Sequence, residues 1–231
     1  MDTSERAPAT RRGRGTRETE PRGSNRALAW FGGGTNGNEQ LTAIAGVILL
    51  VLLPLLGITI VRIGQLIWEH LFLGLLLIGP VALKMASTGY RFVRYYTGNA
   101  EYRRKGPPEL ILRVIGPVVV LSTAVVLATG VMLLIVGPPH RDPWLLLHKV
   151  SFIVWLVFIG LHILGHLPAV GRALGVGPRG RQQRARAAPG AAGRWIVLVG
   201  ALVAGLVLAI VLIPDFSAWS SHGAFVHHHR G

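Results

Sequence analysis

Residues 66–87 read LIWEHLFLGLLLIGPVALKMAS and consist almost entirely of apolar side chains. A helix needs roughly 20 apolar residues to cross a bilayer. Further apolar stretches of similar length occur at residues 41–63, 110–136, 143–168 and 195–214. These stretches lack the alternation of membrane barrel strands and are much longer than such strands, so they are expected to be helical. The sequence therefore predicts an all-α integral membrane bundle of about five transmembrane helices.

The composition supports a membrane protein and narrows its chemistry. The chain is 51% hydrophobic and 15% charged, whereas soluble domains carry roughly 25% charged residues. It has no cysteine, which excludes disulfides and thiolate metal centres. Phosphate-binding loops and HExxH zinc motifs do not occur. Acidic residues are almost absent from the spans, which disfavours a carboxylate relay for proton-driven transport.

Connections rich in basic residues alternate along the chain with connections that hold few, and this alternation predicts the orientation of the protein in the membrane. Residues 1–40 hold seven Arg against five acids, and 84–113 hold seven basic residues against two acids. Residues 172–194 hold six Arg and no acid, while the opposite connections and the tail carry four basic residues together. By the positive-inside rule, the N-terminus is cytoplasmic and the C-terminus extracytoplasmic in a multi-pass protein of the cell membrane. The basic residues behind the net charge of +14 are thus expected to interact with lipid headgroups, and no nucleic-acid partner is expected.

These patterns divide the chain into five segments. Residues 1–38 are expected to form a disordered cytoplasmic leader, because large apolar residues are few there. Residues 39–170 form a four-helix membrane core, and 171–193 form a basic cytoplasmic loop. Residues 194–214 form the fifth span. Residues 215–231 form an extracytoplasmic tail rich in histidine.

Two histidines near the outer ends of inward-running spans are the main candidates for function. His70 lies near the start of the second span and His148 near the start of the fourth. Ionisable residues within a bilayer are costly and suggest a functional site. Two neutral imidazoles on facing helices can ligate a haem iron from both sides. For a single histidine of this kind, a structural hydrogen bond between helices is the competing interpretation.

A second haem would need a second pair of ligands, and the sequence supplies only half of it. His162 follows His148 by 14 residues, which keeps it on a similar helix face about 21 Å away. The equivalent step from His70 reaches Lys84 instead of a histidine. Lys84 is a weaker candidate ligand, because lysine must lose its proton to bind metal. It could instead face a haem propionate, a quinone or a lipid headgroup. His166 is expected at the cytoplasmic interface.

Residues 41–166 resemble the membrane cytochrome b group, which includes cytochrome b561-like proteins and the b subunits of hydrogenases and formate dehydrogenases. The resemblance rests on His70 in one helix, on His148 and His162 in another, and on the small residues around them. It implies haem b within the bundle and electron transfer to or from quinone or a partner redox subunit outside the membrane. The departure at Lys84 puts a second haem in doubt.

The function expected from the sequence is therefore electron transfer through one bis-histidine haem near the outer face. Arg62 would pair with a haem propionate there. Such a chain is more a subunit of a redox system than a complete enzyme. The alternative is a cofactor-free membrane protein, either a small transporter or a scaffold, with structural histidines. A separate weak metal site is possible in the tail, at His227, His228 and His229.

Overall fold

The computed structural model describes residues 34–104, 110–173 and 190–220, and these fold almost entirely as helices. The five long helices are α2 (Gly34–Val61), α3 (Ile67–Tyr96), α5 (Leu110–Val136), α6 (Asp142–Ala173) and α8 (Ala191–Val211). Three short ones complete the described parts: α4 (Ala100–Arg104), the 3₁₀ helix η1 (Pro138–His140) and α9 (Ile213–Ser220).

The five long helices are long and apolar enough to cross a membrane. Their outer surfaces are covered by large apolar side chains; Val61, for example, is 85% exposed and Ile135 is 69% exposed. A soluble protein would not present such a surface to water. The chain is therefore a multi-pass membrane protein, and the all-α bundle predicted from the sequence is confirmed. The helices run past some of the expected ends, and α3 continues from the expected limit at Ser87 to Tyr96.

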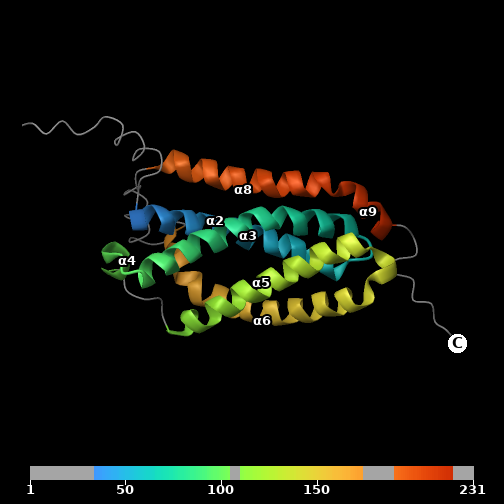
Figure 1. The fold of residues 1–231 in the computed structure, drawn as a ribbon, viewed down its shortest axis with the longest axis horizontal. Coiled ribbons are helices and arrows are strands. Elements are labelled where there is room, and N and C mark those ends of the chain that lie inside the picture. The colour runs from blue at the N-terminus through green and yellow to red at the C-terminus, as the bar shows by residue number, and fades with distance from the viewer. Residues whose placement is uncertain (1–33, 105–109, 174–189, 221–231) are drawn as a thin grey trace, which may run out of the picture.

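The bundle is built from two helical hairpins and one added helix. Helices α2 and α3 pack closely as one hairpin, and α5 and α6 pack closely as the other. Contacts between the hairpins are sparser and run from α2 to α6 and from α3 to α5. Figure 1 shows α8 and the α5–α6 hairpin on opposite sides of the α2–α3 hairpin. We call the end with α4 the α4 end, and the end with the two hairpin turns and α9 the α9 end.

Helix α8 is held against α3 by two glycines, which allow the backbones to approach closely. A Cβ atom at Gly79 of α3 would collide with the carbonyl oxygen of Ala201. A Cβ atom at Gly205 of α8 would collide with the carbonyl oxygen of Leu76. Small residues at such crossings are a common basis of helix association in membranes. The fifth span is thus an integral part of the bundle.

The short helix α9 closes one end of the bundle, where the sequence predicted only a tail. Phe216 is fully buried and Trp219 is 6% exposed, so both are core residues. Trp68 meets Phe216 edge to face, with ring centroids 5.2 Å apart. The cluster that receives α9 draws on α3, α5 and α8, through Leu75, Leu133, Leu134 and Ala209.

Candidate functional site

His70 lies in the first turn of α3 and is held by a threonine of α2. Its Nδ1 atom is 2.9 Å from Thr59 Oγ1. The Thr59 hydroxyl is buried and lies 2.6 Å from the carbonyl oxygen of Leu56, to which it donates. With the single hydrogen of the Thr59 hydroxyl donated to Leu56, the Nδ1–H of His70 is the donor in the bond to Thr59.

His148 is held in the same way on α6, by a threonine of α5. Its Nδ1 atom lies 3.0 Å from Thr129 Oγ1 and 3.2 Å from the carbonyl oxygen of Val126. A carbonyl oxygen can only accept, so Nδ1 again carries the hydrogen. Gly130 of α5 leaves room for the ring, since a Cβ atom there would lie 3.3 Å from His148 Cε1.

These hydrogen bonds assign the same tautomer to both imidazoles. With the hydrogen on Nδ1, each ring keeps its lone pair on Nε2. Within residues 34–104, 110–173 and 190–220, all the hydrogen bonds of the two rings run through Nδ1. Histidines that bind metals are normally fixed in this manner, with one ring nitrogen donating to the protein and the other on the metal. The donor set therefore fits an iron with two axial imidazoles.

The two histidines come from diagonally opposite helices of the four-helix core, yet they lie near each other. Helix α3 packs on α2 and α5, and helix α6 packs on α5 and α2. The rings of His70 and His148 are close enough for a charge on one to act electrostatically on the other. Both side chains are partly buried. The two histidines therefore belong to the four-helix core, one on each hairpin.

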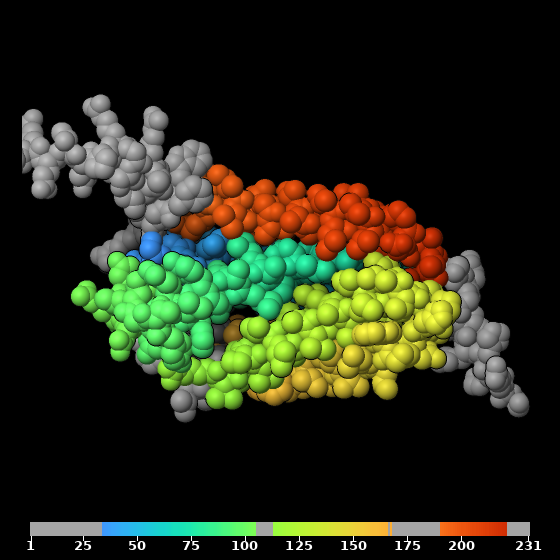
Figure 2. Space-filling model, viewed as in Figure 1, coloured from blue at the N-terminus to red at the C-terminus, as the bar shows by residue number. Residues whose placement is uncertain are grey.

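The space between the hairpins is not closely filled everywhere. Figure 2 shows the surface hollowed between α3 and α5, towards the α4 end, with atoms of α6 visible behind the opening. Near His70, a Cβ atom added to Gly74, one turn further along α3, would meet nothing within 4 Å. The open position at Gly74 lies one turn from His70, whereas the hollow in Figure 2 lies nearer the α4 end.

Lys84 lies nearer the α4 end and binds α2. Its Nζ atom donates to the carbonyl oxygen of Thr42 at 3.0 Å, and it sits over Gly46, where a Cβ atom would be only 2.7 Å away. Thr42 also contacts Ser87 of α3, with hydroxyl oxygens 2.9 Å apart, and Asn38 donates to the Ser87 carbonyl. Lys84 thus belongs to a polar cluster that joins α2 to α3, and ligation of a second haem would require it to leave Thr42.

The other predicted site residues are only partly described. His162 is partly buried on α6 and already takes part in an interaction within the protein. Arg62 is exposed in the α2–α3 turn at the α9 end. The side chain of His166 lies outside the described residues, as do His227, His228 and His229. In the described part of the chain, no three His, Asp or Glu side chains come together to hold a metal ion.

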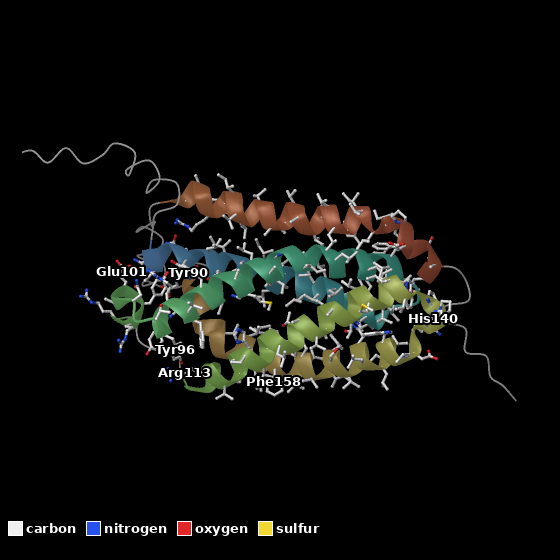
Figure 3. All side chains as sticks on the ribbon, in the orientation of Figure 1. Tyr90, Tyr96, Glu101, Arg113, His140 and Phe158 are labelled. Carbon is white, nitrogen blue, oxygen red and sulfur yellow. The ribbon has the colours of Figure 1, made fainter. Side chains whose placement is uncertain are left out.

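Aromatic and charged side chains gather at the α4 end, far from His140 at the other end (Figure 3). The rings of Tyr90 and Tyr102 meet edge to face, with centroids 6.1 Å apart, and the Arg94 guanidinium lies 5.9 Å from the centre of the Tyr90 ring. Burial raises the pKa of Tyr102 in α4. These rings pack edge to face, as in a structural cluster that anchors α4 to the end of α3.

Comparison of the chain with models of protein families, with curated proteins and with solved structures found no match. The argument for function therefore rests on the residues and their geometry. The cytochrome b resemblance stays an interpretation of the histidine pattern.

The sequence analysis missed the two threonines that hold the histidines. Thr59 and His70 lie at similar distances on either side of the α2–α3 turn, 11 residues apart. Thr129 and His148 lie in the same way around the α5–α6 turn, 19 residues apart. The sequence did hold a signal for these threonines. Each hydroxyl lies in the first helix of a hairpin, about as far from the turn as the histidine in the second helix. The structure thus reveals the same threonine–histidine arrangement in both hairpins.

Proposed function

We propose that this chain is a membrane-embedded electron-transfer protein that holds one haem b between His70 and His148. The observation that carries the proposal is the matched tautomer of the two rings. Each has its Nδ1–H bonded to a threonine of its own hairpin, which leaves the Nε2 lone pair of each ring without a hydrogen bond to the described residues. Histidines with a purely structural role have no need to share one tautomer. Two histidines that ligate one iron both need the hydrogen on one ring nitrogen and the lone pair on the other.

Several features of the bundle support the fit of a flat cofactor. The ligands come from two separate hairpins, and these hairpins contact each other only sparsely. A cofactor bound between them would complete the core. Gly130 leaves room for the His148 ring, because a Cβ atom there would lie 3.3 Å from Cε1, and Gly74 leaves open space one turn from His70. Bis-histidine haems in helical bundles use the same principle of ligands on facing helices.

The protein's part in the chemistry is to bind the haem, to orient its histidine ligands and to shield it from water. Bound haem supplies a one-electron couple at its iron. His70 and His148 would hold the iron through their imidazoles, and two such ligands would disfavour reaction with oxygen. Thr59 and Thr129 fix the ring orientation. Phe216 is fully buried and meets Trp68 edge to face at the same end of the bundle.

The proposed partners follow from the position of the site near the α9 end. On the charge pattern, this end is extracytoplasmic and the N-terminus is cytoplasmic, in the cell membrane. A redox partner subunit would then exchange electrons at the α9 end, where exposed Arg62 is available to a propionate or to that partner. Quinone is the proposed second partner, near the α4 end and Lys84.

The absorption spectrum of the purified full-length chain tests the proposal. Protein from haem-sufficient cells should be red, with a Soret band and a sharp α-band after reduction by dithionite. A colourless preparation that is folded and monodisperse would contradict the proposal. It would favour the alternative, a cofactor-free transporter or scaffold in which His70 and His148 serve only to join helices.

Thr59→Val and Thr129→Val should weaken haem binding while leaving both ligands in place. Valine has nearly the same shape as threonine but cannot accept the Nδ1–H bond, so the ring loses its fixed orientation. Loss of such a supporting hydrogen bond typically weakens metal binding about 10- to 100-fold. The rate of haem transfer to apomyoglobin measures how firmly each variant retains haem. A redox titration measures the accompanying change in the midpoint potential of the haem.

Thr123→Val is the matched control, because it removes a hydroxyl from the same helix α5. Thr123 Oγ1 accepts a bond from Trp155 Nε1 at 2.9 Å and does not contact a histidine. This variant should keep the potential and the haem retention of the wild type. Equal changes in all three variants would mean that the threonines act only on general stability.

A further inference from the structure

A pocket between α2 and α8 lies outside the proposed haem site. It has a volume of about 190 Å³. Its walls are formed by Gln40, Leu41, Ile44, Ala191, Arg194, Trp195 and Leu198. Gln40 and Arg194 lie within the first two turns of α2 and α8, so the pocket is at the α4 end of the bundle.

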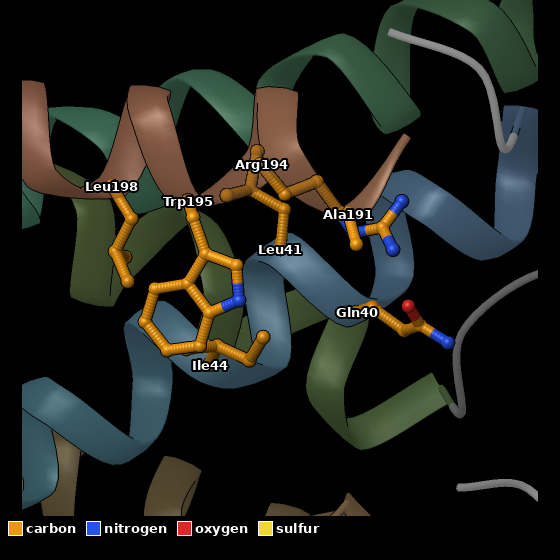
Figure 4. A pocket seen from close by; sticks show the side chains of 7 residues that line it. All are labelled: Gln40, Leu41, Ile44, Ala191, Arg194, Trp195 and Leu198. Atoms are coloured by element: carbon orange, nitrogen blue, oxygen red, sulfur yellow. The ribbon is translucent and has the colours of Figure 1, made fainter. Parts of the chain in front are cut away.

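The pocket is polar at one end and apolar at the other. Figure 4 shows the Arg194 guanidinium and the Gln40 amide on one side, with Ile44, Leu198 and the Trp195 ring on the other. Because α2 and α8 run in the same direction from the α4 end, the polar side faces the end of the bundle. The apolar side faces the middle of the membrane, and Leu198 there is only 3% exposed.

This polarity matches the way a phospholipid stands in a leaflet, with its phosphate at the interface and its acyl chains towards the centre. Arg194 is the one charged residue among the seven that line the pocket. It already takes part in an interaction within the protein, and a guanidinium has five N–H donors, enough to bind a phosphate as well. The Trp195 ring is 56% exposed to the surroundings of the bundle, as is usual for tryptophan at a membrane interface.

The size of the pocket is compatible with part of a lipid. Pockets that enclose a drug-sized molecule measure roughly 300–1,000 Å³, so a cavity of about 190 Å³ would hold only part of a larger molecule such as a lipid. A lipid can leave the remainder of its acyl chains in the bilayer without cost. We propose that the α2–α8 pocket is a specific site for one anionic phospholipid, with the phosphate on Arg194 and an acyl chain along Ile44 and Leu198.

Native mass spectrometry of the full chain, released from detergent with phosphatidylglycerol or phosphatidylcholine, tests this site. The wild type should retain one phosphatidylglycerol in preference to phosphatidylcholine. Arg194→Gln should reduce that preference about fivefold, the effect of one arginine near an anionic lipid surface. Ile44→Trp fills the apolar side while the charge remains, and it should reduce the retention of phosphatidylglycerol as well.

Arg103→Gln is the control, because Arg103 is an exposed cation of α4 at the same end of the bundle. It should leave the preference unchanged. Equal losses in Arg103→Gln and Arg194→Gln would overturn the proposal in favour of general surface attraction. Full displacement of phosphatidylglycerol by millimolar inorganic phosphate would also overturn it, since the pocket would then be a site for free anions. None of these measurements depends on haem.

Discussion

His70→Ala and His148→Ala should each abolish the low-spin haem spectrum, whereas His140→Ala should leave it intact. Each alanine removes one of the two Nε2 ligands and leaves an iron with a single protein ligand, which binds far more weakly and favours the high-spin state. The measurement is the haem-to-chain ratio of the purified variants, together with their reduced α-band. His140 lies in η1 at the same end of the bundle and is exposed, so it is a matched histidine outside the site.

Imidazole rescue separates the loss of a ligand from misfolding. The alanine variants should recover the low-spin spectrum when imidazole is added with haem, because the free ring can enter the space left by the side chain. Retention of a wild-type spectrum in either variant would rule that histidine out as a ligand. The same test on His162→Ala should leave the single haem in place.

Gly79→Ala and Gly205→Ala should produce the largest losses of stability among the single small substitutions in the membrane helices. In each case the new methyl group collides with a backbone carbonyl of the neighbouring helix, at Ala201 or Leu76, which cannot move aside as a flexible side chain would. Overpacking typically costs about 1–3 kcal/mol. The apparent Tm in detergent should fall by about 2–12 °C for a chain of this size.

Gly200→Ala and Gly57→Ala are the controls for this packing. A Cβ atom at either position meets nothing within 4 Å, although both glycines lie inside long helices. Alanine is the better helix former by about 1 kcal/mol, so these variants should keep or slightly raise the apparent Tm. Similar losses at all four glycines would show that α8 is not held by close contact at Gly79 and Gly205.

The membrane bundle could be predicted from the sequence because the physical constraint is strong. Lipid offers no hydrogen-bond partner to the backbone, so apolar stretches of about 20 residues must be helical. The ends of the helices could be predicted less accurately. Residues 88–96, which include Arg91 and Arg94, continue α3 beyond the apolar stretch, since helix propagation does not depend on hydrophobicity once the span is formed.

Helix α9 and the supporting threonines could not be predicted with the same ease. The i, i+3 spacing of Ile213, Phe216 and Trp219 is a short amphipathic pattern. A single turn or two of this kind becomes a helix only through its contacts with α3, α5 and α8. Thr59 and Thr129 are ordinary residues in a transmembrane helix until the hairpin geometry brings them to the histidines. The candidate ligands were visible from the sequence, but their orientation and tautomer needed the fold.

The most direct measurement of the central claim is the low-temperature electron paramagnetic resonance spectrum of the oxidised wild-type protein. The account predicts one low-spin ferric signal of the kind given by two axial imidazoles, at about one spin per chain. A high-spin ferric signal, or a folded protein without any haem signal, would contradict the claim that His70 and His148 share one iron.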